Sequence, residues 1–106
     1  MINITFKPNT LELEITGHAL HGKKGEDIVC SAISTLFYAL GETLNQSANM
    51  LENEPVFKDE DGKGYLSCKP KKEYGGNIAT MYRTILVGIE LVATYYPQNV
   101  TFKVEG

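Results

Sequence analysis

Apolar and polar residues alternate in the first part of the chain. Apolar side chains occupy every second position from 2 to 6 and again from 11 to 15, and Lys7-Pro8-Asn9 interrupts the pattern between the two runs. A period of two is typical of β-strands with one face buried and the other in water. The chain is therefore predicted to begin with a β-hairpin that has one face exposed to solvent.

The spacing of apolar residues changes at about residue 27. From Asp27 to about Leu51 they recur three and four positions apart, which is typical of an amphipathic helix. A second helix is predicted from about Asn77 to Tyr96, because Pro97 cannot continue it. The apolar face of the first helix is predicted to comprise Val29, Ile33, Leu36, Leu40 and Leu44, and that of the second Ile78, Met81, Tyr82, Ile85, Ile89 and Val92.

The segment between the two helices contains another pair of strand-like runs. Residues 55–58 and 65–68 flank the sequence DEDGKG, which is rich in turn formers and predicts a hairpin with a solvated tip. Val100, Phe102 and Val104 alternate with polar residues and predict a final strand. The resulting order, ββαββαβ, indicates a two-layer α+β fold in which two helices pack on a largely antiparallel sheet.

Length and charge narrow the class of protein. The 106 residues suit one domain over positions 1–106. The formal charge of −3 does not favour direct nucleic-acid binding, which normally requires a basic surface. The first residues lack a signal-peptide pattern, and no uninterrupted run of 18 apolar residues is present. We therefore expect a cytoplasmic protein without a membrane span, whose two cysteines are free thiols.

Cys30 is the first candidate for chemistry. With Asp27 as the N-cap of the first helix, Cys30 falls at the third helical position, and Ser34 lies one turn further on the same edge of the apolar face. A helix start or a neighbouring protonated histidine favours the thiolate, which is the nucleophilic form. A single helical cysteine beside an apolar face is, however, also typical of an inert packing residue.

A histidine precedes the helix at a suitable place. His18 follows Gly17 at the end of the second predicted strand, and imidazole is the usual base for a cysteine nucleophile. The connection from Ala19 to Glu26 is rich in glycine and lysine, so we expect it to be mobile and to close over a ligand, although a plain polar connection is the commoner explanation. Its candidate contact residues are His21, Gly22, Lys23, Lys24 and Gly25.

Three short motifs in fixed order resemble a known family. Gly17-His18-Ala19, the segment 25–30 (GEDIVC) and Ala32-Ile33-Ser34 are similar to the bacterial ribosomal-processing cysteine proteases called Prp, and residues 88–106 resemble the end of that family. The resemblance implies removal of a short N-terminal extension from the large-subunit ribosomal protein numbered twenty-seven, without metal or cofactor. It also implies a homodimer.

The resemblance assigns roles to individual residues. It implies that Cys30 is the nucleophile and His18 the base, with Gly17, Asp27 and Ser34 in supporting positions. His21 stands where an aromatic residue is common in the family, which places a second imidazole near the loop. Backbone N–H groups at the helix start are natural donors to an oxyanion, because they leave the first turn unsatisfied.

Several alternatives remain open from the sequence. Asp27 can orient His18 or act only as a helix cap, and for Ser34 a structural role is preferred to one that steadies the sulfur. Cys68 is interpreted as a spectator thiol that takes no part in catalysis. Val87 and Leu91 lie opposite the core face of the second helix and suggest a partner subunit. The alternative function is a non-catalytic, ribosome-associated module that binds a ribosomal protein or RNA.

Overall fold

The computed structural model describes residues 1–17, 27–60 and 62–106, and it confirms the predicted α+β fold. The five strands and two α-helices follow one another in the predicted order ββαββαβ, with two short 3₁₀ turns added. Their bounds are β1 (Ile2–Lys7), β2 (Glu12–Gly17), α1 (Ile28–Gln46), η1 (Ala48–Met50), β3 (Val56–Glu60), β4 (Lys63–Ser67), η2 (Lys72–Tyr74), α2 (Gly75–Tyr95) and β5 (Val100–Val104).

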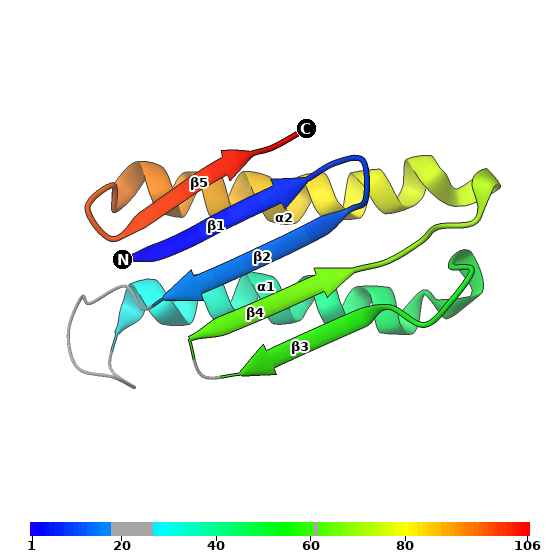
Figure 1. Cartoon of the computed structure of the whole chain (residues 1–106), viewed down its shortest axis with the longest axis horizontal. Helices are drawn as coiled ribbons and strands as arrows, with labels where there is room; N and C mark the ends of the chain where they lie inside the picture. The colour runs from blue at the N-terminus through cyan, green and yellow to red at the C-terminus, as the bar shows by residue number, and fades with distance from the viewer. Residues whose placement is uncertain (18–26, 61) are drawn as a thin grey trace.

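The strands form one sheet in the order β3-β4-β2-β1-β5 (Figure 1). Both predicted hairpins, β1–β2 and β3–β4, are antiparallel, as is the pairing of β2 with β4. Only β5 runs parallel to its neighbour, β1, because α2 returns the chain to the end of the sheet at which β1 also starts. The two edges of the sheet are therefore β3 and β5.

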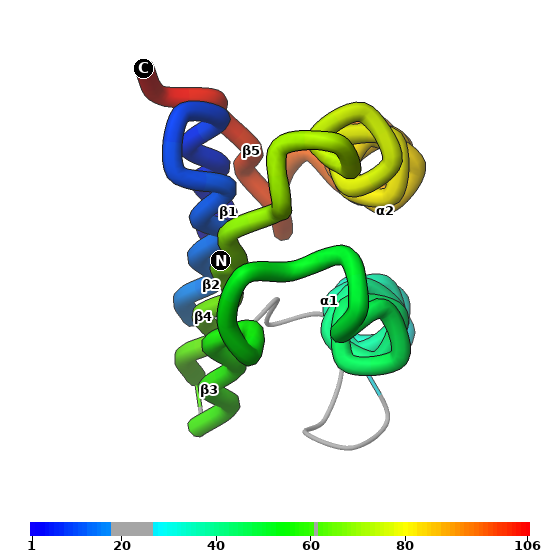
Figure 2. The backbone as a smooth tube through the Cα atoms, turned by 90° about the vertical axis from the view of Figure 1, so that its right-hand side faces the viewer, coloured from blue at the N-terminus to red at the C-terminus, as the bar shows by residue number. Residues whose placement is uncertain are grey.

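Both helices cover the same face of the sheet, side by side (Figure 2). The inward residues of β1 and β2 and the apolar faces of α1 and α2 meet in one hydrophobic core. The most deeply buried side chains of this core include Ile4, Leu13, Val29, Leu44, Leu66, Ile78, Tyr82 and Ile89. The opposite face of the sheet is polar, as the alternation in β1 and β2 predicted, and carries ion pairs such as Lys7 with Glu14.

The helix boundaries differ from the predicted ones in detail. α1 ends at Gln46 rather than near Leu51, because the backbone leaves the helical conformation at Ser47, and η1 then leads to Leu51 in an isolated bridge with Pro70. α2 begins at Gly75, two residues before the predicted start. On α1 the buried face includes Phe37, while Leu36 is only partly buried.

Leu36 packs instead between the two helices. A Cβ added to Gly88 would lie 2.9 Å from Cδ2 of Leu36, so the glycine allows α2 to approach α1 closely.

Both α1 and the segment Lys72–Tyr95 are long and apolar enough to pass a length and hydropathy test for membrane spans. That is weak evidence for a membrane, because core helices pass the same test and each of these helices contributes a buried face to the core.

Candidate active site

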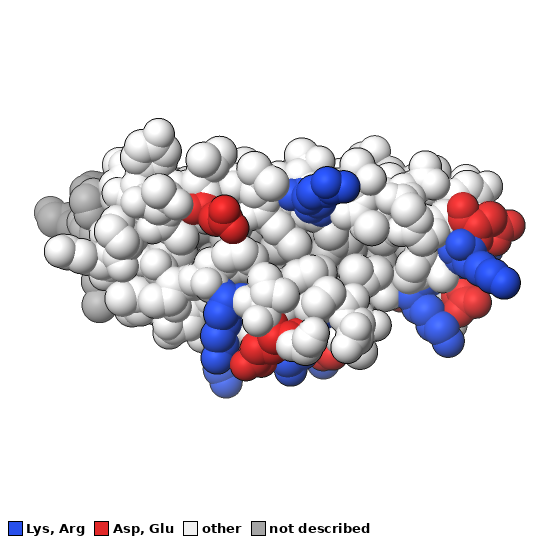
Figure 3. Space-filling model, turned by 90° about the horizontal axis from the view of Figure 1, so that it is seen from above, with Lys and Arg blue, Asp and Glu red and all other residues white. Residues whose placement is uncertain are grey.

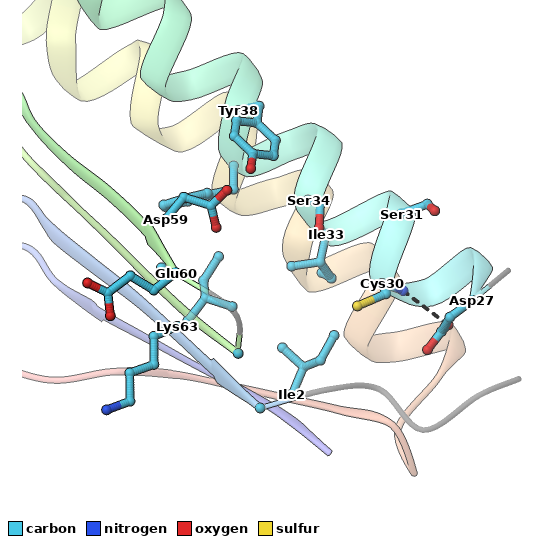
Figure 4. A pocket seen from close by; sticks show the side chains of 15 residues that line it. Ile2, Asp27, Cys30, Ser31, Ile33, Ser34, Tyr38, Asp59, Glu60 and Lys63 are labelled. Carbon is cyan, nitrogen blue, oxygen red and sulfur yellow. Dashed lines mark hydrogen bonds between the residues drawn. The ribbon is translucent and has the colours of Figure 1, made fainter. Parts of the chain in front are cut away.

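A cavity of about 470 Å³ opens between the first half of α1 and the ends of β2, β4 and β3 (Figure 4). It brings together four residues that the sequence analysis had singled out at separate points of the chain. Gly17 comes from the end of β2, Asp27 from the cap of α1, and Cys30 and Ser34 from its first two turns. The Cys30 side chain is partly buried, and its sulfur points into the cavity (Figure 4).

Asp27 holds the start of α1, as predicted. Its Oδ1 accepts hydrogen bonds from the backbone N–H of Val29 at 2.9 Å and of Cys30 at 3.1 Å, and the residue is only 6% exposed. An aspartate in this position satisfies backbone donors that the helix itself leaves without partners. The cap fixes Cys30 at the third helical position and so determines where its sulfur lies.

The same two hydrogen bonds change one expectation about catalysis. The N–H groups of the first turn were expected to be unsatisfied, but those of Val29 and Cys30 are both bonded to Asp27. That expectation is wrong for these two groups, because a short acidic side chain at the cap competes for the donors that an oxyanion would use. Either N–H could serve an oxyanion only if the Asp27 carboxylate shared or released it.

Gly17 ends β2 in a conformation that other residues adopt rarely. Its φ is +90°, and a Cβ at this position would lie 2.2 Å from the backbone oxygen of Met1. The Gly17 N–H also donates to the carbonyl of Gly62 at 2.8 Å, which ties β2 to the β3–β4 turn. A glycine is thus required at the end of β2, directly before His18, the predicted base.

Tyr38 and Asp59 are among the residues of the cavity wall that were not predicted as part of a site. Tyr38 lies two turns along α1 from Cys30 on the face that carries Ser34, and Asp59 lies across from it on β3 (Figure 4). Asp59 had been interpreted as part of a solvated hairpin tip, but it lies within β3 and lines the cavity. The four-residue spacing of positions 30, 34 and 38 could have indicated Tyr38, whereas Asp59 comes close only through the fold.

The second cysteine lies in different surroundings. Cys68 follows β4, packs against the core, and accepts a hydrogen bond from the Tyr82 hydroxyl at 3.7 Å. Burial raises the pKa of the Cys68 thiol, and the bond from Tyr82 offsets part of this rise. Cys68 is not among the described residues that line the Cys30 cavity.

The remaining predicted site residues lie outside the described part of the chain. These are His18, His21, Gly22, Lys23, Lys24 and Gly25, together with the rest of the connection from Ala19 to Glu26 that was predicted to close over a ligand. Among the residues that are described, no three His, Cys, Asp or Glu side chains lie together in a way that could hold a metal ion.

The fold and the cavity define a class of protein, a small α+β protein with a candidate thiol nucleophile at the start of a helix. The family model for "Cysteine protease Prp" matches residues 1–101. The chain belongs to the Prp family of cysteine proteases.

Individual relatives agree with this assignment. The ribosomal processing cysteine protease Prp of Mycoplasma pneumoniae is 25% identical over 103 residues, which is 97% of this chain and 94% of the relative. That of Staphylococcus aureus is 21% identical over 99 residues, covering 93% and 91%.

Solved structures share the fold. A crystal structure of Staphylococcus aureus Prp with a covalently linked product peptide superposes with a TM-score of 0.75 at 20% identity, covering 99% of this chain and 100% of that one. A Streptococcus mutans crystal structure gives a TM-score of 0.68 at 27% identity, covering 97% and 90%.

Proposed function

We propose that the chain is an endopeptidase in which Cys30 is the nucleophile and His18 the general base. The observation that carries this proposal is the position of Cys30, whose sulfur faces a cavity that Gly17, Asp27 and Ser34 also line. Membership of a cysteine protease family favours this function over the non-catalytic binding module. Ser34 has an exposed side chain on the same wall, where it can contact a bound peptide.

The proposed reaction proceeds by acyl transfer. His18 takes the thiol proton, and the Cys30 sulfur attacks the carbonyl carbon of the scissile peptide bond. The carbon–nitrogen bond breaks as the leaving amine accepts the proton from His18. Water, deprotonated by His18, then attacks the thioester, which releases the second peptide and restores the thiol. Gly17 directly precedes His18, and its N–H donates to the carbonyl of Gly62, which anchors the sheet end from which the imidazole would approach.

The proposed substrate is the N-terminal extension of the large-subunit ribosomal protein numbered twenty-seven. The curated relatives are named ribosomal processing proteases, and one solved structure of Staphylococcus aureus Prp holds a substrate peptide. Both facts support a peptide segment of a ribosomal protein as the substrate of this chain. Such a substrate would place the protein in the cytoplasm, where ribosomes assemble.

We further propose that the protein is a homodimer through the outer face of α2. Val87 and Leu91 are 53% and 54% exposed, and Tyr95, one turn further, is 76% exposed. Figure 3 views the molecule from the side of α2 and β5, and charged side chains are sparse over the helix. Leu91→Glu should convert a dimer into a monomer in sedimentation at micromolar concentration, whereas a monomeric wild type would refute this interface.

The decisive experiment uses the precursor of the ribosomal protein numbered twenty-seven, with its N-terminal extension, from the same cell. Purified protein is incubated with it, and the products are analysed by mass spectrometry. Loss of an N-terminal peptide at one bond is expected, and His18→Ala should slow this cleavage more than His21→Ala. A larger effect of His21→Ala would reassign the base. An intact precursor after prolonged incubation with folded protein would overturn the proposed substrate.

A further inference from the structure

A second cavity, of about 220 Å³, lies beyond the Cys30 cavity along α1. Tyr38 lines both cavities, so they share a wall and follow one another along the helix. The described residues that line the second cavity are Tyr38, Gly41, Glu42, Asn45, Pro55 and Phe57. Its helical residues continue the face of α1 that begins with Cys30 and Ser34, because positions three and four apart lie on one side of a helix.

Aromatic rings form the wall on the strand side. Phe57 comes from β3, the edge strand of the sheet, and its ring lies 4.9 Å from that of Phe37 and 5.7 Å from that of Tyr38, centroid to centroid. A Cβ on Gly41 would come within 2.4 Å of the Phe57 ring, so only glycine lets the ring settle against α1. Phe57 and Tyr38 nevertheless remain 38% and 48% exposed, which leaves aromatic surface open to a ligand.

The two cavities also carry negative charge. Glu42 lines the second cavity and Asp59 the first, and neither forms an ion pair with any residue that the structure describes. One Glu42 oxygen, Oε1, accepts a hydrogen bond from Gln46 at 3.1 Å. Lys63 is the basic residue among the described lining, and its ammonium points away from Cys30 (Figure 4). A carboxylate beside exposed aromatic rings is a favourable environment for a lysine or arginine side chain.

We propose that the two cavities form one groove for an extended peptide, and that the second cavity binds a lysine or arginine side chain of the substrate. This inference rests on the proposed function, since the position of the basic side chain is counted from the peptide bond next to Cys30. Cys30 and Glu42 are 12 positions apart on α1, or about 18 Å at ~1.5 Å per residue. An extended chain advances about 3.3 Å per residue, so the basic side chain lies about four to six residues from the scissile bond.

The charge of the groove suits the proposed class of substrate. Proteins that bind RNA make many of their contacts through lysine and arginine to phosphate groups. A segment of a ribosomal protein therefore supplies basic side chains more often than an average peptide does. The acidic groove would select such segments, while the Cys30 cavity would hold the bond to be cut.

The test measures peptide binding separately from cleavage. Cys30→Ala protein is titrated with fluorescent peptides that carry one lysine, moved stepwise through eight positions on each side of the scissile bond. We expect one position, about four to six residues from that bond, at which replacing lysine by alanine weakens binding about threefold to tenfold. Equal affinities across the scan would overturn the groove, even if the wild type cleaves every peptide.

A charge exchange assigns the effect to the second cavity. Glu42→Lys should weaken binding of the lysine peptide that binds best. The same variant should bind more tightly a peptide in which glutamate replaces that lysine. Glu73→Lys, the same change at an exposed position of η2 that lines neither cavity, is the matched control and should alter neither affinity. If Glu42→Lys weakens both peptides equally, the site is not where we place it. Lysine-dependent binding without cleavage by the wild type would refute the proposed protease function but keep the groove.

Discussion

The two cysteines of this chain occupy opposite kinds of environment. Cys30 stands at the start of α1, with its N–H held by the Asp27 cap and its sulfur facing an open cavity. Cys68 follows β4, packs against the core and accepts a hydrogen bond from Tyr82. Burial raises the pKa of the Cys68 thiol, which keeps it in the protonated, unreactive form at neutral pH.

This difference shows that position, rather than residue type, decides which thiol is available for chemistry. Both residues are free cysteines of intermediate exposure, so the exposed fraction of the residue does not separate them. What separates them is the space in front of the sulfur and the groups around it. The following experiments test that distinction, beginning with the largest expected effect.

Replacement of each cysteine by alanine should give contrasting effects on cleavage. Cys30→Ala should lower the rate about a thousandfold or more, because no positioning contact replaces a missing nucleophile. It should still bind the precursor, since few atoms change at the cavity wall. Cys68→Ala should leave the rate within about twofold. The rates are measured by mass spectrometry of the products, and wild-type cleavage by Cys30→Ala would contradict the assignment.

Alkylation should separate the two thiols in the intact protein. Iodoacetamide reacts with the thiolate, so a raised pKa lowers the reactive fraction at any given pH below it. Cys30 should therefore be modified faster than Cys68 at neutral pH, by about an order of magnitude. Peptide mass spectrometry across a pH series should show the Cys68 rate rising only above the range of an ordinary thiol. Equal rates for the two residues in native protein would contradict this prediction.

The parts of the site that were predicted from the sequence depend on local signals. The capping role of Asp27, the helical position of Cys30 and the place of Gly17 at a strand end all follow from residues a few positions apart. The order of elements followed in the same way, from changes in apolar spacing. Local patterns are informative here because helices and hairpins are stabilised by contacts between residues close in sequence.

The second cavity could not be predicted in this way. From the sequence, Gly41 within a helix indicates only a less stable helix. Its role is evident only from the fold, in which Phe57 of β3 packs against it. Phe57 itself was part of an unremarkable hairpin strand, and Asp59 part of its presumed tip. These contacts depend on β3 lying at the sheet edge beside α1, and apolar spacing does not specify the order of strands.

Asp27 offers a test of how the nucleophile is held. Asp27→Ala should lower the free energy of unfolding by about 1 kcal/mol, because the N–H groups of Val29 and Cys30 lose their acceptor. Asp27→Asn should retain most of that stability, since asparagine is an equally good cap. Urea denaturation measures both variants. If Asp27 acts only as a cap, Asp27→Asn also keeps the cleavage rate, and a severe loss of rate in this stable variant would instead assign it to orienting His18.

The smallest effect is expected where the Cys68 environment is altered. Tyr82 is almost fully buried and packs with Phe6, while its hydroxyl donates to the Cys68 sulfur. Sulfur is a weak acceptor, so Tyr82→Phe should change the free energy of unfolding by less than about 1 kcal/mol. The hydrogen bond from the hydroxyl lowers the pKa of Cys68, so its removal should make alkylation of Cys68 slower still. The Cys30 rate should not change, because Tyr82 is not among the residues that line its cavity. Faster alkylation of Cys68 in Tyr82→Phe would mean that the ring and hydroxyl shield the thiol rather than stabilise its charged form.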